Sequence, residues 1–293
     1  MRGVLCCVVS MLFLTGRSVA PTTRYAMRVA YDGTRFKGWQ VQPTHRTVQG
    51  VLHEALGRRF GGSPIGTLGA SRTDTGVHAR GQVAHCDLPV EALSGDALEL
   101  LEHQVNRLLP DDVRVFELRP APAPEPWQVE DGLPWHAIAN SRGKRYSYRL
   151  AARRGGPDPL ARLYRAHVAH APLDLAKLDA TLQSFVGEHD FAAFANLSPG
   201  GVLATNRSTV RTLRSAHLLD EGGGDATVVF ELDGAMYKML RNVVGTAVAV
   251  AAGSLDADKC AYLLSGAAKR TDNPAKAAPA HGLCLDRVFY DDY

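Results

Sequence analysis

In the first half of the chain, large apolar residues alternate with small or polar ones over short stretches. The segment from residue 25 to residue 31 reads YAMRVAY, so every second side chain is large and apolar. A period of two predicts a strand that is buried on one face. Similar patterns predict further strands over residues 65–68, 82–88 and 113–118.

Between these strands, apolar residues recur at the helical spacing of three and four. One such stretch covers residues 48–56 and follows Thr47, whose side chain is a suitable N-cap. A second covers residues 97–108 and ends before Pro110. The predicted order is therefore βαββαβ, which is the ferredoxin-like arrangement.

The second half of the chain repeats this outline. We expect strands over residues 135–140, 144–150, 209–218, 227–232 and 283–290, and helices over residues 175–186, 236–252 and 256–264. Two tandem ferredoxin-like units predict an α+β fold with one extended mixed or antiparallel sheet. We expect helices on one face of that sheet and a cleft between the halves.

A proline-rich segment without periodicity, PAPAPEPWQVEDGLP, separates the two halves. Such composition is typical of a linker. We therefore predict an N-terminal domain over residues 25–119, a linker over residues 120–134 and a C-terminal domain over residues 135–293.

Residues 1–20 differ from the rest of the chain. Arg2 precedes an apolar run from Val4 to Leu14, and Ser18 to Ala20 form a small-residue cleavage site. This is the pattern of a targeting leader, and it is too short to span a bilayer. We expect delivery to an organelle, a plastid or a mitochondrion, and no stable membrane association of the mature chain. The alternative is an uncleaved extension of a cytoplasmic or nuclear protein.

The 293 residues are 45% hydrophobic and 22% charged, which is typical of a soluble globular protein. A net charge of +3 is weak evidence for a nucleic-acid partner. Basic residues nevertheless crowd one segment: Arg142, Lys144, Arg145, Arg149, Arg153, Arg154, Arg162 and Arg165. Such local density suits a surface that follows phosphates, and a merely solvated basic face is the alternative.

The stretch with most chemical content is ASRTDTGVHARGQVAHCD, residues 70–87. Arg72 and Asp74 are two residues apart, which places both side chains on one side of an extended segment. Thr73, Thr75 and Gly76 favour a loop around that pair. A weak surface ion pair is the plain alternative.

This stretch resembles the signature of the TruA-like tRNA pseudouridine synthase family, whose usual form is G/S-R-T-D-x-G-V-H-A. Further motifs follow in the family's order from Tyr25 to Tyr290: YDGTRFKGWQVQ, NRLLPDDV, WHAIANSRGKRYSY, GEHDFAAF and MLRNVVG. The resemblance implies an isomerase that converts uridine to pseudouridine in the anticodon stem-loop of tRNA, at positions thirty-eight to forty in bacterial members.

The resemblance also identifies candidate catalytic residues. It implies that Asp74 is the catalytic aspartate, supported by Arg72, Tyr146 and Arg241. A buried aspartate stays ionised only beside a cation, for which Arg72 is nearest by spacing and Arg241 is second. Either arginine could instead serve phosphate alone. Tyr146 is expected to stack on the flipped-out base, and a plain core tyrosine is the alternative.

Four further residues are candidates for RNA contact: Lys144, Arg145, His78 and Trp39. For His78 and Trp39 a structural role is an equal alternative. The isomerisation oxidises nothing and carries no group away, so we expect neither a cofactor nor a metal. The expected partners are the anticodon arm of tRNA and, by the family resemblance, a second copy of the chain in a homodimer.

Two other functions remain open from the residues alone. An RNA-binding or chaperone module on the same scaffold would have no use for the carboxylate of Asp74. A glycosidase or nuclease would need a second acid nearby, and Asp87 is the only other one in the signature.

Overall fold

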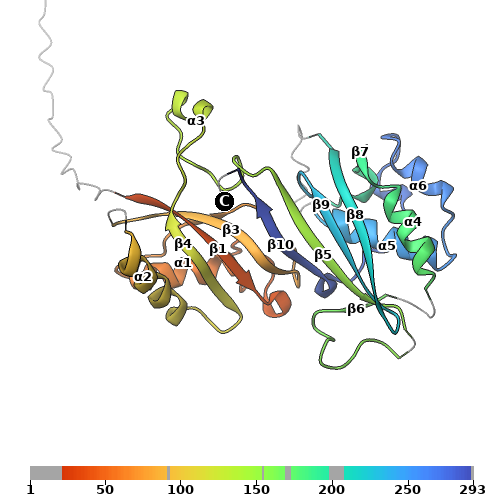
Figure 1. The fold of residues 1–293 in the computed structure, drawn as a ribbon, viewed down its shortest axis with the longest axis horizontal. Helices are drawn as coiled ribbons and strands as arrows, with labels where there is room; N and C mark the ends of the chain where they lie inside the picture. Colours follow the sequence, from red (N-terminus) through yellow and green to blue (C-terminus); the bar gives the residue numbers. More distant parts are fainter. Residues whose placement is uncertain (1–21, 91–92, 154, 169–172, 198–207, 292–293) are drawn as a thin grey trace, which may run out of the picture.

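The computed structural model describes residues 22–90, 93–153, 155–168, 173–197 and 208–291, so the predicted leader lies outside the described residues. The described strands form one 10-stranded sheet in the order β4-β1-β3-β10-β5-β9-β8-β7, with β2 beside β3 and β6 beside β5 (Figure 1). This confirms the predicted α+β fold with an extended mixed sheet.

The first half has the predicted βαββαβ order. Its elements are β1 (Thr23–Tyr31), α1 (Val48–Arg59), β2 (Thr67–Gly69), β3 (His78–Leu88), α2 (Gly95–Leu108) and β4 (Val113–Pro120). Strand β1 lies between β3 and β4 and is antiparallel to both. The hydroxyl of Thr47 accepts a hydrogen bond from the Gly50 N–H, which makes it the N-cap of α1 as predicted.

The proline-rich segment contains a helical turn, α3 (Pro126–Glu130), which begins with proline. The strand predicted over residues 135–140 is wrong, because these residues form turns instead. The amide of Asn140 accepts a hydrogen bond from the His136 N–H at 2.8 Å and closes the turn. Trp135 is buried with its ring 6.0 Å from that of His85 on β3. This segment therefore packs on the sheet rather than joining it.

The second half repeats the same order with insertions. Its elements are β5 (Gly143–Ala151), β6 (Ala166–His167), α4 (Leu175–Gln183), β7 (Gly187–Asp190), β8 (Val210–Gly222), β9 (Asp225–Leu232), α5 (Met239–Ala251), α6 (Asp258–Leu263) and β10 (Leu283–Phe289). Helix α5 begins later than predicted because Lys238 has a left-handed backbone, with φ of 60°. Within the described residues, no helix combines the length and apolarity needed to cross a bilayer.

Strand β10 joins the two halves. It is antiparallel to β5 and parallel to β3, where Cys284 faces His78 and Leu285 faces Ala79. A Cβ atom on Gly81 would lie only 2.2 Å from the carbonyl oxygen of Asp286, so the two backbones come this close only because residue 81 is glycine.

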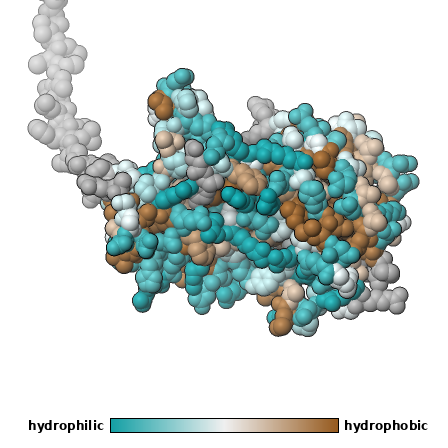
Figure 2. Space-filling model, in the orientation of Figure 1, coloured by the Kyte–Doolittle hydropathy of each residue, from teal (hydrophilic) through white to brown (hydrophobic). Residues whose placement is uncertain are grey.

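The two faces of the sheet differ. On one face, Tyr25, Tyr146 and Tyr148 are buried, and the Tyr148 hydroxyl donates to the Pro279 carbonyl next to α5. On the other face, arginines pair with glutamates, as in Arg28–Glu117 and Arg145–Glu231. Figure 2 shows hydrophilic residues across the middle of the molecule, over the central strands. The core thus lies under the helices, and the opposite face of the sheet is polar.

Candidate active site

The Arg72–Asp74 segment lies in the loop between β2 and β3, as predicted. The Val77 N–H donates to the Asp74 carbonyl at 3.1 Å and closes a tight turn. The Trp39 N–H donates to the Thr73 carbonyl at 3.1 Å, and the Thr73 hydroxyl shares a 2.7 Å hydrogen bond with that of Tyr31. The loop is therefore held by neighbouring backbone and by a buried tyrosine.

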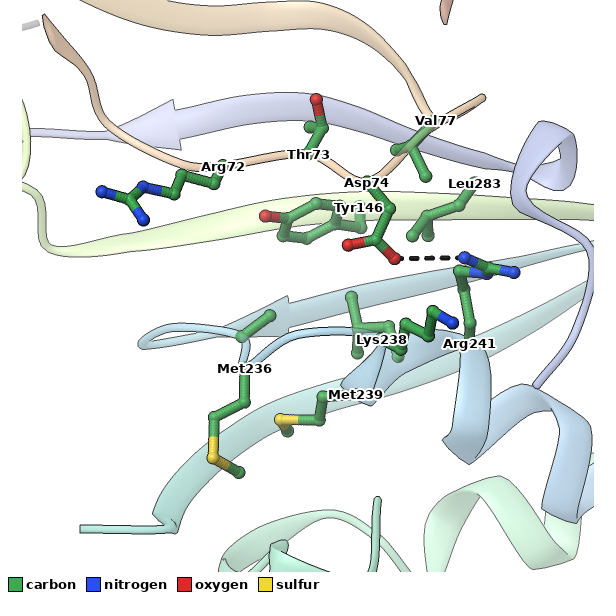
Figure 3. A pocket seen from close by; sticks show the side chains of 12 residues that line it. Arg72, Thr73, Asp74, Val77, Tyr146, Met236, Lys238, Met239, Arg241 and Leu283 are labelled. Carbon is green, nitrogen blue, oxygen red and sulfur yellow. Dashed lines mark hydrogen bonds and ion pairs between the residues drawn. The ribbon is translucent and has the colours of Figure 1, made fainter. Parts of the chain in front are cut away.

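Asp74 forms an ion pair with an arginine from the other half of the chain. Its Oδ2 lies 3.2 Å from Nη1 of Arg241 on α5, and the two side chains are only 12% and 14% exposed (Figure 3). Nε of Arg241 also donates to the Ala278 carbonyl at 2.8 Å, which fixes the guanidinium in place. This ion pair thus joins two of the four predicted catalytic residues.

Burial and the neighbouring cations shift the pKa of Asp74 in opposite directions. Burial raises the pKa of Asp74, and it outweighs the lowering by Arg241 and by the ammonium and backbone N–H of Lys238. A carboxylate that is buried, cation-supported and yet perturbed in this direction is characteristic of functional sites.

Tyr146 lies beside Asp74, as Figure 3 shows. It projects from β5 and is 4% exposed, and its hydroxyl shares a 2.9 Å hydrogen bond with the Ser71 hydroxyl at the start of the loop. Burial raises the pKa of Tyr146 to about 12, so the phenol is neutral at pH 7. The ring is held at both ends, by the strand and by the loop.

These groups line one pocket at the junction of the two halves. Its walls include the apolar side chains of Val77, Met236, Met239 and Leu283. Its polar groups are those of Asp74, Arg241, Lys238 and Tyr146, with Arg72 and Thr73 at the loop. A carboxylate next to a cation between apolar walls can act as a nucleophile or a base on a desolvated substrate.

Arg72 is not the counter-ion of Asp74. Its side chain is exposed and extends away from the carboxylate (Figure 3). The expectation from spacing is therefore wrong. Residues two apart share a side in a strand, and residues 70–77 lie between β2 and β3 and form no strand. Arg241, ranked second from the sequence, occupies that place, and Arg72 lies on the rim of the pocket.

Lys144 and Arg145 do not line this pocket. Arg145 lies on the opposite face of the sheet, where its Nε donates to Glu231 at 2.8 Å. Lys144 is only 7% exposed, and burial lowers its pKa. RNA contact by this pair stays a prediction, and the structure places it outside the pocket of Asp74.

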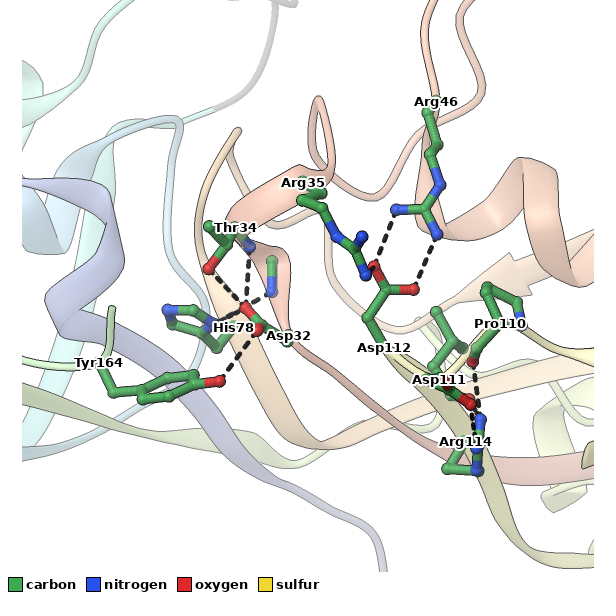
Figure 4. A network of polar contacts seen from close by, with 12 residues as sticks. Asp32, Thr34, Arg35, Arg46, His78, Pro110, Asp111, Asp112, Arg114 and Tyr164 are labelled. Atoms are coloured by element: carbon green, nitrogen blue, oxygen red, sulfur yellow. Dashed lines mark hydrogen bonds and ion pairs between the residues drawn. The ribbon is translucent and has the colours of Figure 1, made fainter. Parts of the chain in front are cut away.

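Trp39 and His78 are internal as well. Trp39 is 1% exposed and packs against Gly69, where a Cβ atom would lie 2.5 Å from its ring. His78, which lies beside Asp32 in Figure 4, is 6% exposed. Its Nδ1 accepts from the Gly33 N–H at 3.0 Å, and its Nε2 lies 3.0 Å from the Leu163 carbonyl. Burial of both side chains favours the structural alternative, in which they support the loop.

Sequence reasoning missed Lys238 and Ser71. It placed Lys238 inside a helix, whereas Lys238 precedes α5 in a left-handed conformation and directs its N–H at Asp74. Ser71 shares its hydrogen bond with a residue 75 positions away in the chain, so no local pattern indicated the contact.

Comparisons with known proteins identify the family of this chain. Residues 181–291 match the family model described as tRNA pseudouridine synthase. The tRNA pseudouridine synthase A of Lacticaseibacillus casei is 36% identical over 92% of this chain and 100% of its own length. Those of Solidesulfovibrio magneticus and Streptomyces griseus are 40% and 38% identical, over 91% of this chain and over 91% and 88% of their own lengths. The chain therefore belongs to the tRNA pseudouridine synthase family, which is a family of isomerases.

Proposed function

We propose that this protein converts uridine to pseudouridine in tRNA and that Asp74 is the catalytic residue. The observation that carries the proposal is the ion pair of Asp74 and Arg241 inside a pocket with apolar walls. The three relatives named above, which cover nearly the whole chain, are each named tRNA pseudouridine synthase A. Their substrate class therefore supports tRNA as the substrate.

The reaction rearranges bonds within one nucleotide. The N1–C1′ glycosidic bond breaks, the uracil turns, and a C5–C1′ bond forms. The C5 proton leaves and N1 takes up a proton, so the composition is unchanged. Asp74 has to be ionised to act as a nucleophile or as a base, and Arg241 supports the ionised form against burial.

The remaining pocket residues suit a base that has left the stack. A flipped uridine needs a closed site that holds the detached uracil between cleavage and rejoining. Val77, Met239 and Leu283 supply apolar walls, and the buried ring of Tyr146 supplies a flat surface beside the carboxylate. The exposed guanidinium of Arg72 at the rim is suited to the RNA outside the pocket, either by stacking or by binding phosphate.

We further propose that the target lies in the anticodon arm and that the active form is a homodimer. Both rest on the family resemblance of the motifs. A dimer would supply additional basic surface to a chain whose net charge is only +3. Light scattering at several protein concentrations, with and without tRNA, tests the dimer separately from catalysis.

The direct test uses the chain from Pro21 and tRNA carrying tritium at C5 of uridine. Tritium release accompanies formation of the C5–C1′ bond, so it reports the isomerisation. The wild-type protein should release tritium and Asp74→Asn should not. Asp87→Asn is the matched control, because Asp87 is the other acid of the signature and pairs with Arg24 outside the pocket.

Three results would contradict parts of the proposal. Equal release by wild type and Asp74→Asn would reject Asp74 as the catalytic residue but keep the reaction. If only Asp87→Asn lost tritium release, Asp87 and not Asp74 would be the carboxylate that the reaction needs. Binding of tRNA without release by any protein would favour an RNA-binding module.

A further inference from the structure

We propose that a second cavity, on the face of the sheet opposite to Asp74, binds a phosphate group. The cavity has a volume of about 250 Å³ and lies where the ends of β1, β3, β5 and β10 meet the segment around Tyr164. Its lining includes Asp32, His78, Arg80, Arg149, Tyr164 and Cys284. Leu283 lines the catalytic pocket and Cys284 lines this cavity, and neighbouring residues of a strand face opposite sides.

Two arginines bring positive charge to the cavity. Arg80 comes from β3 and Arg149 from β5, the strands on either side of β10. Both guanidinium groups lower the pKa of the Cys284 thiol, which burial and Asp286 raise to about 12. Cys284 lies on β10 between them, so the two positive charges act on the same point of the cavity wall.

These arginines differ from others on the same face. Arg28 and Arg145 each pair with a glutamate, at 2.9 and 2.5 Å. Among the residues that the structure describes, no carboxylate lies within 4.0 Å of Arg80 or Arg149. The donors of both arginines are therefore not occupied by an ion pair. Asp32 lines the same cavity and Asp286 acts on Cys284, and a phosphate can accept hydrogen bonds from both guanidinium groups.

Two nearby acids, Asp32 and Glu221, have other partners, and Asp286 hydrogen-bonds with the Cys284 thiol. Asp32 accepts hydrogen bonds from the N–H and hydroxyl of Thr34 and from the Tyr164 hydroxyl at 2.9 Å (Figure 4). Glu221 accepts from Arg165 and from Thr227. His78 has both ring nitrogens satisfied inside the protein, and burial lowers its pKa. The wall of the cavity is therefore fixed. Within the part of the chain that the structure describes, neither arginine is held in an ion pair, although the charge of Arg149 also acts on Glu221.

The chemistry favours phosphate with an attached group. Each guanidinium presents a planar fork of donors that matches phosphate oxygens. A volume of about 250 Å³ exceeds that of one phosphate ion, so there is room for a sugar or a nucleoside beside it. Such a ligand is either a phosphodiester of bound RNA, from a part that does not enter the catalytic pocket, or a free phosphorylated small molecule.

The test compares Arg80→Ala, Arg149→Ala and the double variant with wild type. Arg80 is exposed and Arg149 is partly exposed, so the variants should fold, and thermal unfolding checks this. Arg28→Ala is the matched control, since it removes one charge from the same face but from an existing ion pair. Arg→Gln versions provide a second set if truncation lowers the melting temperature. The readouts are binding measurements, so they do not depend on Asp74 being catalytic.

In the first measurement, calorimetry uses inorganic phosphate and adenosine 5′-monophosphate as probes. In the second, tRNA binding is followed over a range of salt concentrations. Loss of about 10-fold in tRNA affinity in the double variant, with a shallower salt dependence by about one phosphate contact, identifies an RNA phosphate. Loss of probe binding with unchanged tRNA binding identifies a free phosphorylated molecule. Wild type that binds neither probe, together with a double variant that binds tRNA like Arg28→Ala, overturns the proposal.

Discussion

The two halves of this protein have the same order of elements but differ at one connection. In the second half, β8 and β9 are joined by a tight hairpin at Gly222, Gly223 and Gly224. In the first half, the equivalent strands β2 and β3 are joined by the loop that holds Asp74. The second half thus has a short turn at this connection, whereas the first half has a longer loop that carries the candidate catalytic residue.

The strands next to these connections differ as well. β8 has 13 residues, whereas β2 has only 3. Because β2 pairs only with residues 84–86 of β3, the beginning of β3 is free to pair with β10. The shortening of one strand therefore allows the two sheets to join, and it places the loop above the junction.

This difference explains why the site needs both halves. The loop supplies Asp74 and Ser71, and the second half supplies Tyr146 from β5 and Arg241 from α5. Neither unit alone contains both the carboxylate and its counter-ion. The following predictions test this division from the largest expected effect to the smallest.

Gly81→Ala should have the largest effect, because it forces apart the strands that join the halves. The new Cβ would meet the Asp286 carbonyl at 2.2 Å, which only a backbone shift can relieve. We expect a loss of about 1–3 kcal/mol in the free energy of unfolding and loss of tritium release. Gly66→Ala is the control, since nothing lies within 4 Å of its Cβ. An active, stable Gly81→Ala would show that the junction does not position the site.

Tyr146→Ala should come next. Stacking of a base on an aromatic ring contributes about 1–3 kcal/mol, so kcat/KM should fall by about 10- to 100-fold. Tyr146→Phe keeps the ring and should fall by less than about fivefold. Equal losses in both variants would mean that the hydroxyl, and not the ring, is what the reaction needs.

Asp74→Asn should raise the melting temperature at pH 7 although it abolishes activity. Burial raises the pKa of Asp74 in the folded state, so ionisation at neutral pH costs stability that asparagine does not lose. The difference should vanish as the pH falls below the unfolded value of about 3.9. Scanning calorimetry over that pH range checks both points. A lower melting temperature of Asp74→Asn at pH 7 would mean that the ion pair stabilises the fold.

Ser71→Ala should have the smallest effect. It removes the hydrogen bond to the Tyr146 hydroxyl, which is worth about 0.5–1.5 kcal/mol. We expect kcat to fall by less than about fivefold, with KM unchanged. Ser71→Thr keeps the hydroxyl and should restore activity, whereas failure of that rescue would assign Ser71 a purely steric role.

Local patterns in the sequence predict much of the fold. The alternation in β1 and the Thr47 cap of α1 depend on neighbouring residues, so both were predicted. The false strand over residues 135–140 has a similar alternation, but the Asn140 side chain closes a turn there. Further side-chain hydrogen bonds, from the Ile138 and Ala139 N–H groups to His136 Nδ1, also hold this turn, and the pattern of apolar residues does not record them.

The candidate site was predicted less completely, because its geometry depends on residues far apart in the chain. The motifs identified Asp74, Tyr146 and Arg241. Arg241 is 167 positions from Asp74, so spacing favoured Arg72 as the counter-ion instead. The burial of Trp39 and His78 likewise follows from packing between segments, which no local pattern records.

The central claim is that Arg241, from the second half, favours the ionised form of Asp74, from the first half. The most direct test is the pH dependence of kcat/KM for tritium release by wild type, Arg241→Gln and Arg241→Lys. Removing the positive charge favours the protonated form of Asp74, so the acidic limb of the profile should move to higher pH in Arg241→Gln. Arg241→Lys should keep the limb near the wild-type position. An Arg241→Gln profile that is lower at every pH but unshifted would contradict the account, because Arg241 would then bind RNA phosphate without acting on Asp74.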